Sequence, residues 1–127
     1  MSTATTRGIR VTVSMQYVAE QSEPRAHRYV FAYTARIENE GEVTVELRTR
    51  HWVITDGLGH VEEVRGTGVL GCQPSIKPGD HFEYTSGCIL RTPRGEMRGT
   101  YQMHCASGEV FDAVIAPFAL ALPQSLN

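Results

Sequence analysis

Apolar and polar side chains alternate along most of this chain. The alternation is clearest in residues 11–17, 29–37, 82–90 and 97–105. Successive side chains of a β-strand leave opposite faces of the sheet, so this two-residue period predicts strands with one buried face. Between residues 43 and 54 the apolar positions change phase, which predicts a β-bulge near Arg48–His51.

Turn signals separate the alternating segments. Further strands are expected at residues 60–64 and 110–116, which brings the total to about seven. Asn39–Glu42 is expected to form a hairpin turn. Pro117 and Pro123 are expected to end regular pairing, because proline cannot donate a backbone hydrogen bond. No segment has the pattern of an amphipathic helix, so the sequence predicts an all-β sandwich with Trp52 in its core.

The length of 127 residues fits one domain. Residues 1–7 lack an apolar cluster and are expected to form a disordered lead-in, with residues 8–127 as the single domain. This start does not resemble a signal peptide, and three cysteines do not suggest a disulfide framework. We therefore expect a cytoplasmic protein with free thiols.

Charge and hydropathy exclude two classes of partner. The 12 basic and 14 acidic residues are mixed along the chain and give a net charge of −2. Without a basic stripe, a nucleic-acid-binding role lacks its electrostatic basis. No apolar run approaches the roughly 20 residues of a membrane span.

Residues 66–71 spell the glycine motif G-x-G-x-x-G. In dinucleotide-binding folds this motif leads into a helix, but here Pro74 and Pro78 forbid a continuous helix. A weaker hypothesis survives, in which consecutive backbone N–H groups form an anion-binding nest with help from flanking cations. The candidate anion loop comprises Arg65, Gly66, Gly68, Gly71 and Lys77. The alternative is that the glycines let the chain cross between sheets at close quarters.

No constellation of catalytic or metal-binding residues is evident. The chain has no Gly-x-Ser-x-Gly elbow, and its histidines lack the spacing of a metal site. Cys88 and Cys105 continue apolar stripes and are expected to be buried, whereas Cys72 lies in the glycine-rich loop and is expected to be exposed. We therefore predict no catalytic residues, no metal and no cofactor.

Several motifs occur in the order typical of one family. They include His51–Asp56, Val64–Gly71, Phe82–Gly87 and Gly99–Met103, and the matching region runs from about Gly8 to about Pro123. In these motifs the chain resembles the ApaG domain family. The resemblance implies an immunoglobulin-like, fibronectin type III-like sandwich. It also implies a link to cobalt resistance and magnesium efflux in bacteria, and use of the domain as an interaction module.

These observations lead to two hypotheses. The first is a non-catalytic interaction domain that binds a protein partner, as a monomer or a weak homodimer. The alternative is a small-molecule binder that holds a phosphate or pyrophosphate group at the Gly66–Gly71 loop. A third and weaker hypothesis is an enzyme that acts on phosphorylated compounds.

Overall fold

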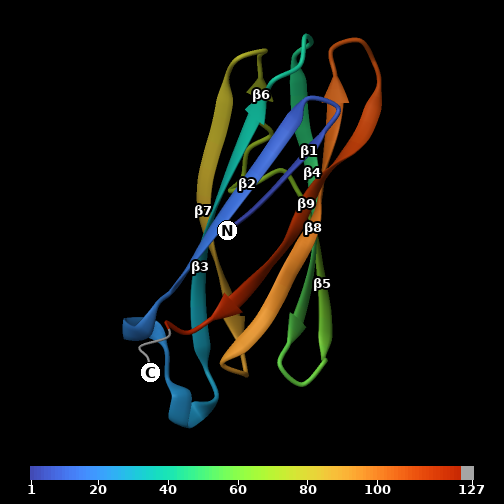
Figure 1. The fold of residues 1–127 in the computed structure, drawn as a ribbon. Helices are drawn as coiled ribbons and strands as arrows, with labels where there is room; N and C mark the ends of the chain where they lie inside the picture. The colour runs from blue at the N-terminus through green and yellow to red at the C-terminus, as the bar shows by residue number, and fades with distance from the viewer. Residues whose placement is uncertain (124–127) are drawn as a thin grey trace.

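The computed structural model describes residues 1–123 and contains two antiparallel sheets packed face to face (Figure 1). Sheet order is β1-β2-β3-β7 in one layer and β5-β4-β8-β9 in the other, where the short β6 also pairs with β4. The elements within residues 1–123 are β1 (Ser2–Thr6), β2 (Ile9–Tyr17), η1 (Ala19–Gln21), η2 (Pro24–Ala26), β3 (Tyr29–Asn39), β4 (Val45–Asp56), β5 (Val61–Thr67), β6 (Ser75–Ile76), β7 (His81–Leu90), β8 (Arg94–Cys105) and β9 (Val110–Ala121), where η denotes a 3₁₀ turn. This arrangement confirms the predicted all-β sandwich. The predicted domain reached residue 127, and residues 124–127 lie outside the described part.

The alternating segments correspond to β2, β3, β4, β5, β7, β8 and β9. The predicted bulge is confirmed, because the register between β4 and β8 shifts between Leu47 and Thr49. The shift leaves Arg48 unpaired with β8 and allows both Leu47 and Trp52 to face the core. Sequence reasoning missed β6, whose two residues are too few to show any period.

The N-terminal segment differs from the prediction of a disordered lead-in at residues 1–7. Ser2–Thr6 forms β1, which pairs with Ile9–Val13 of β2. The connecting residues Arg7 and Gly8 have φ values of 49° and 83°, as a tight two-residue hairpin turn requires. The small Thr and Ala side chains of β1 hid the strand, although the Arg-Gly pair directly before the alternating segment of β2 was visible as a turn signal.

Two predicted chain breaks have other roles in the structure. Asn39–Glu42 is not a hairpin turn, because β3 and β4 belong to different sheets. Pro117 does not end β9, which continues to Ala121. The register between β8 and β9 shifts there, so that Arg98 faces both Ala116 and Pro117 in a bulge. A bulge on an edge strand tolerates a residue that cannot donate to the ladder.

Asn39 fastens the crossing from one sheet to the other. It is the buried polar side chain of the described core, with 2% of its surface exposed. Its Nδ2 donates to the carbonyls of Val43 and Ile76 at 2.8 and 2.9 Å, and its Oδ1 accepts the amide of Gly41 at 2.9 Å. Because a buried amide side chain must be hydrogen-bonded, these contacts fix the path of the chain between β3 and β4.

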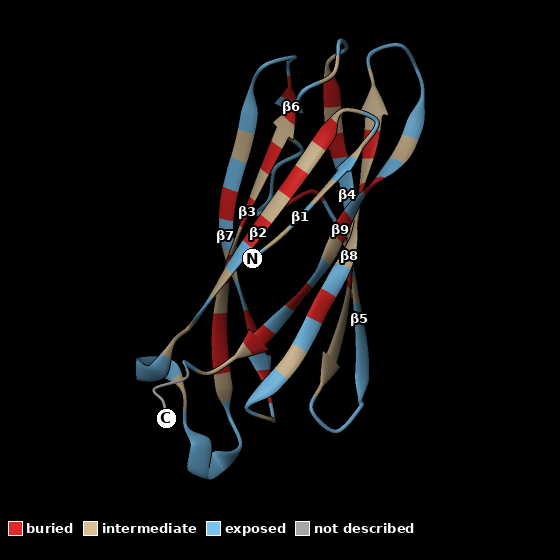
Figure 2. Ribbon diagram, viewed as in Figure 1, coloured by how far each residue is buried: buried red, intermediate tan, exposed pale blue. Residues whose placement is uncertain are grey.

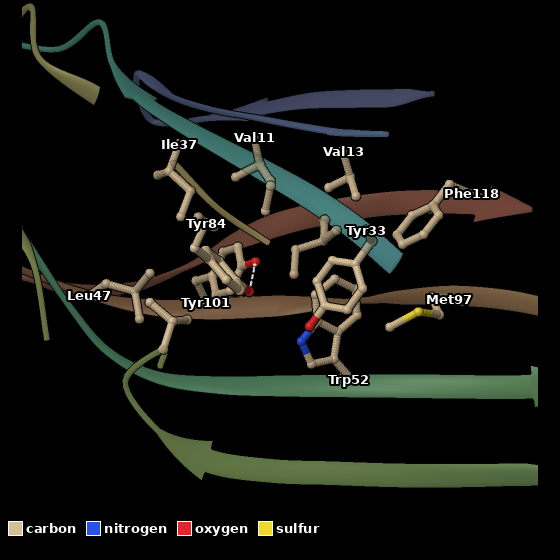
Figure 3. Close-up of a cluster of buried hydrophobic side chains, with 14 of the residues drawn as sticks. Val11, Val13, Tyr33, Ile37, Leu47, Trp52, Tyr84, Met97, Tyr101 and Phe118 are labelled. Atoms are coloured by element: carbon tan, nitrogen blue, oxygen red, sulfur yellow. Dashed lines mark hydrogen bonds between the residues drawn. The ribbon is translucent and has the colours of Figure 1, made fainter. Parts of the chain in front are cut away.

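Buried residues alternate with less buried ones along the strands of both sheets (Figure 2), so the buried side chains line the facing surfaces. At the centre, Tyr33 and Tyr84 of one sheet pack against Trp52, Tyr101 and Phe118 of the other (Figure 3). The indole of Trp52, which is 2% exposed, confirms its predicted place in the core.

The hydroxyls of Tyr84 and Tyr101 meet inside this layer at 2.6 Å (Figure 3). Burial raises the pKa of both phenols, because a phenolate in this position would lose its hydration. The pair therefore remains neutral and links the two sheets across the core.

We expect Tyr84→Phe and Tyr101→Phe each to lower the free energy of unfolding by about 1–2 kcal/mol, because each leaves a buried hydroxyl without this partner. The double variant should lose less than the sum of the two single losses, since one hydrogen bond is removed in all three proteins. Urea denaturation measures the effect. Strictly additive losses would show that the two hydroxyls stabilise the fold independently.

Candidate functional site

The predicted anion loop forms a tight turn after β5. Leu70 and Gly71 have φ values of 47° and 79°, and they connect Val69 to Cys72. The amides and carbonyls of Val69 and Cys72 bond each other at 2.9 and 3.0 Å, and the amide of Gly68 donates to the Arg48 carbonyl at 2.8 Å. These three donors are engaged within the protein, so they do not form a free nest for an anion.

Close packing accounts for two of the three glycines. A Cβ on Gly68 would lie 2.1 Å from the Cys72 carbonyl oxygen, and a Cβ on Gly66 would lie 2.6 Å from the guanidinium carbon of Arg50. Arg50 lies over Gly66, and its Nη1 donates to the Thr67 and Gly68 carbonyls at 3.2 and 2.8 Å. Arg50 therefore braces the loop, a role that the sequence motif did not reveal.

The two flanking cations do not converge on the loop. Arg65 lies opposite His51 on β4, whereas Ile76, the neighbour of Lys77, lies opposite Val45. Six positions along a strand span about 20 Å, so Arg65 and Lys77 lie far apart. Arg65 is also engaged by Glu63, with 3.3 Å between Nη2 and Oε1. The geometry supports the alternative, in which the glycines serve chain packing, and phosphate binding stays a prediction.

A larger feature is an open groove of about 1050 Å³ at one end of the sandwich. Its walls come from the β4–β5 hairpin, the end of β7 and the turn after η2. Three exposed apolar side chains line it, namely Leu58, Val61 and Ile89, with exposed fractions of 87%, 52% and 55%. Apolar side chains gathered in one cleft, and not scattered singly, are typical of a binding surface.

Hydrogen bonds hold the walls of this groove in place. Oδ1 of Asp56 accepts the amides of Leu58 and His60, both at 2.9 Å. The amide of Gly57 donates to Oγ1 of Thr92 at 2.8 Å, which ties the β4–β5 hairpin to the β7–β8 connection. The groove is therefore preformed, and a ligand would not have to order it.

Polar groups surround the apolar part of the groove. They are His27, His60 and Arg91, from three different connections of the fold, and Glu62 of β5. Sequence reasoning weighed the histidines as metal ligands and did not assemble a groove. The lining residues are dispersed from Ala26 to Thr92, so no local motif could have found them.

Within residues 1–123, no group of three or more His, Cys, Asp or Glu side chains is placed to hold a metal ion. The exposed pair of His51 and Glu63 lies on the outer face of the β5–β4 sheet, with 2.7 Å between Nε2 and Oε1. The hydrogen bond from His51 lowers the pKa of Glu63, as expected for an ordinary surface contact. Over the described residues, no helix has the length and apolar character needed to cross a membrane.

The cysteines lie in three different environments. Cys72 is exposed, as predicted, Cys88 is buried and Cys105 is partly buried. Burial raises the pKa of the Cys88 thiol to about 11, which makes it a small core residue and not a reactive nucleophile.

Comparison with known proteins identifies relatives over the whole chain. The family model for the ApaG domain matches residues 19–105. The chain is 56% identical to Protein ApaG of Anaeromyxobacter dehalogenans over 127 residues, which cover 100% of both chains. It is 56% identical to Protein ApaG of Rhodospirillum centenum over 124 residues, which cover 98% of this chain and 95% of the relative. The crystal structure of the putative ApaA protein from Bordetella pertussis superposes with a TM-score of 0.90 and 52% identity, covering 92% of this chain and 95% of that one.

We expect Gly68→Val to unfold the protein or to lower its free energy of unfolding by more than about 2 kcal/mol, because the new side chain collides with backbone. Gly71→Ala is the matched control. It has the same need for positive φ but no atom within 4 Å of the added Cβ, so it should cost only about 1–2 kcal/mol. Thermal unfolding of both variants checks the difference. If Gly68→Val is as stable as the wild type, Gly68 is not needed for packing, and the loop again becomes a candidate ligand site.

Proposed function

This chain belongs to the ApaG domain family, and we propose that it is a non-catalytic cytoplasmic binding domain that recognises an extended segment of a protein partner in the apolar groove. By family resemblance, the proposal includes an influence on cobalt resistance and magnesium efflux through that partner. The observation that carries it is the preformed groove lined by Leu58, Val61 and Ile89. The described residues offer no comparable cluster of metal-ligating groups.

The edge of β5 supports an extended polypeptide as the occupant. The amide of Asp56 donates to the His60 carbonyl, and the amide of Gly68 donates to the Arg48 carbonyl. Every second residue pair of the β4–β5 ladder between these two bonds is therefore hydrogen-bonded. The backbone N–H and C=O groups of Val61, Glu63 and Arg65 consequently point away from β4. No residue of β5 is buried (Figure 2).

A partner strand can therefore pair with β5 while its side chains enter the adjoining groove. Addition of a strand to an exposed sheet edge is a common mode of peptide recognition, in which backbone bonds supply affinity and pockets supply specificity. A small molecule could fill part of the groove but could not use the row of backbone groups along β5.

Selection of nonapeptides from a random phage library against the immobilised domain tests this proposal. We expect selected peptides with apolar residues at alternate positions, and amide NMR shifts centred on β5 and the groove. Leu58→Asp and Val61→Asp should each weaken binding at least tenfold, because both place a charge in the apolar lining.

Val43→Asp is the matched control, since Val43 is also an exposed apolar residue, with 43% of its surface accessible, but lies in the crossing after β3. This variant should bind the selected peptides as the wild type does. Equal loss in all three variants, or shifts remote from the groove, would contradict the proposal.

The domain by itself should have no tight cation site. We expect calorimetric titration with Co²⁺ or Mg²⁺ to show no stoichiometric binding below about 1 μM, since few-ligand surface sites bind these ions weakly. A sub-micromolar site would instead make direct metal binding the function. Pyrophosphate belongs in the same series, because saturable amide shifts confined to Arg65–Lys77 would favour the alternative phosphate-binding function.

A further inference from the structure

Within residues 1–123, β7 pairs with β3 alone, so its other edge is open on the side of the sandwich that holds the groove. The amide of Asn39 donates to the Asp80 carbonyl at 3.0 Å, which makes this the first hydrogen-bonded pair of the β3–β7 ladder. Bonded pairs then alternate along an antiparallel ladder, so Phe82, Tyr84, Ser86 and Cys88 bond β3. The backbone groups of the intervening residues Glu83, Thr85, Gly87 and Ile89 therefore point away from the sheet.

Several of the usual protections of an edge strand are missing from β7. Its ten residues include neither proline nor lysine, and its register with β3 is continuous over the whole strand. Ile89 is 55% exposed, and the Cβ position of Gly87 has only the Phe31 carbonyl oxygen within 4 Å, at 3.5 Å. A long, regular and uncovered edge of this kind can pair with another strand.

On the opposite side of the sandwich the edges cover each other. Thr6 of β1 accepts the Val114 amide of β9 through its Oγ1 at 3.0 Å. The edge available for a further strand in the four-stranded sheet is therefore that of β7.

The exposed side chains of β7, together with Arg91 directly after the strand, are complementary to one another. When two copies of the strand run antiparallel about a two-fold axis at Gly87, Glu83 of each copy faces Arg91 of the other. Thr85 then faces Ile89, and Gly87 faces Gly87. Moving one copy by two residues along the strand places Glu83 opposite Ile89 in one direction and Thr85 opposite Arg91 in the other. Neither register places Glu83 opposite Arg91.

We propose that β7 pairs with β7 of a second copy of this chain in this register, which joins two four-stranded sheets into one of eight strands. Both charge pairs and two pairs of β-branched residues stabilise the contact, and like charges do not meet. The interface is small, which makes the dimer weak and reversible. Ile89 and Arg91 also line the groove, so Glu83 and Thr85 of the second copy lie beside its entrance and shape what it admits.

Sedimentation velocity over protein concentrations from about 10 μM to about 1 mM tests the proposal. The wild type should shift from the 14.1 kDa monomer towards a species of twice that mass. Glu83→Arg and Arg91→Glu should each weaken association at least about tenfold, because the two-fold axis converts two attractive pairs into two repulsive ones. The double variant E83R/R91E should associate as the wild type does.

A mixture of the two single variants provides the decisive test. One carries two arginines and the other two glutamates at these positions, so the mixture should form a heterodimer at concentrations where each variant alone associates less than the wild type. Restored association cannot result from a folding defect. Glu42→Arg, an exposed charge reversal in the crossing after β3, is the control and should leave dimerisation unchanged.

A wild type that remains monomeric at every concentration overturns the proposal. So does a dimer that neither charge reversal weakens, or a mixture of the single variants that fails to associate. The peptide-binding test uses Leu58 and Val61, which lie outside this register, so the two proposals can fail separately.

Discussion

An aromatic layer holds the two sheets of this protein together. Tyr33 lies 5.0 Å from Trp52 between ring centroids, and Phe118 and Tyr101 pack edge-on against the same indole. Each antiparallel sheet has one apolar face that is stable only when covered, and these rings fill the space between the two faces. The phenolic oxygens inside the layer must find partners away from water, and the contact between Tyr84 and Tyr101 meets that requirement across the sheets.

This packing also determines which edges of the sandwich are closed. The β1 and β9 edges meet through the bond between Thr6 and Val114. On the other side, the segment after β5 inserts Val69 and Ile76 into the core, each at most 2% exposed. That segment closes one part of the side, and the groove lies in the remaining part, between the end of β7 and the β4–β5 hairpin.

The functional interpretation follows from this division. The glycine motif lies in the closing segment, where Gly68 and Arg50 satisfy the demands of packing and backbone hydrogen bonding. The groove lies where closure stops, so it retains apolar side chains without cover and sheet edges without partners. Recognition of polypeptide strands is the chemistry that such a surface favours, with one edge suited to a partner protein and the other to a second copy of the chain.

Much of the fold could be predicted from the local alternation of apolar and polar residues. The alternation in β2, β3, β7 and β8, the phase change at Arg48 and the burial of Trp52 were predictable, because each depends on side chains close in sequence. The family resemblance was predictable for a different reason, since its motifs occur in a fixed order along the chain. β1 was missed because its Thr and Ala side chains carry little hydrophobic contrast, and its stability depends on pairing with β2.

Seven of the nine described strands and the membership of the ApaG domain family could be recognised without a structure, because both are encoded in neighbouring residues. Tertiary structure decided which strands pair, that Asn39–Glu42 crosses between sheets, and that Gly68 is a packing residue. It also brought Leu58, Val61 and Ile89 together and left β5 and β7 at free edges. Those features depend on contacts between residues far apart in sequence, and no local pattern specifies which backbone groups remain unpaired when the sandwich has closed.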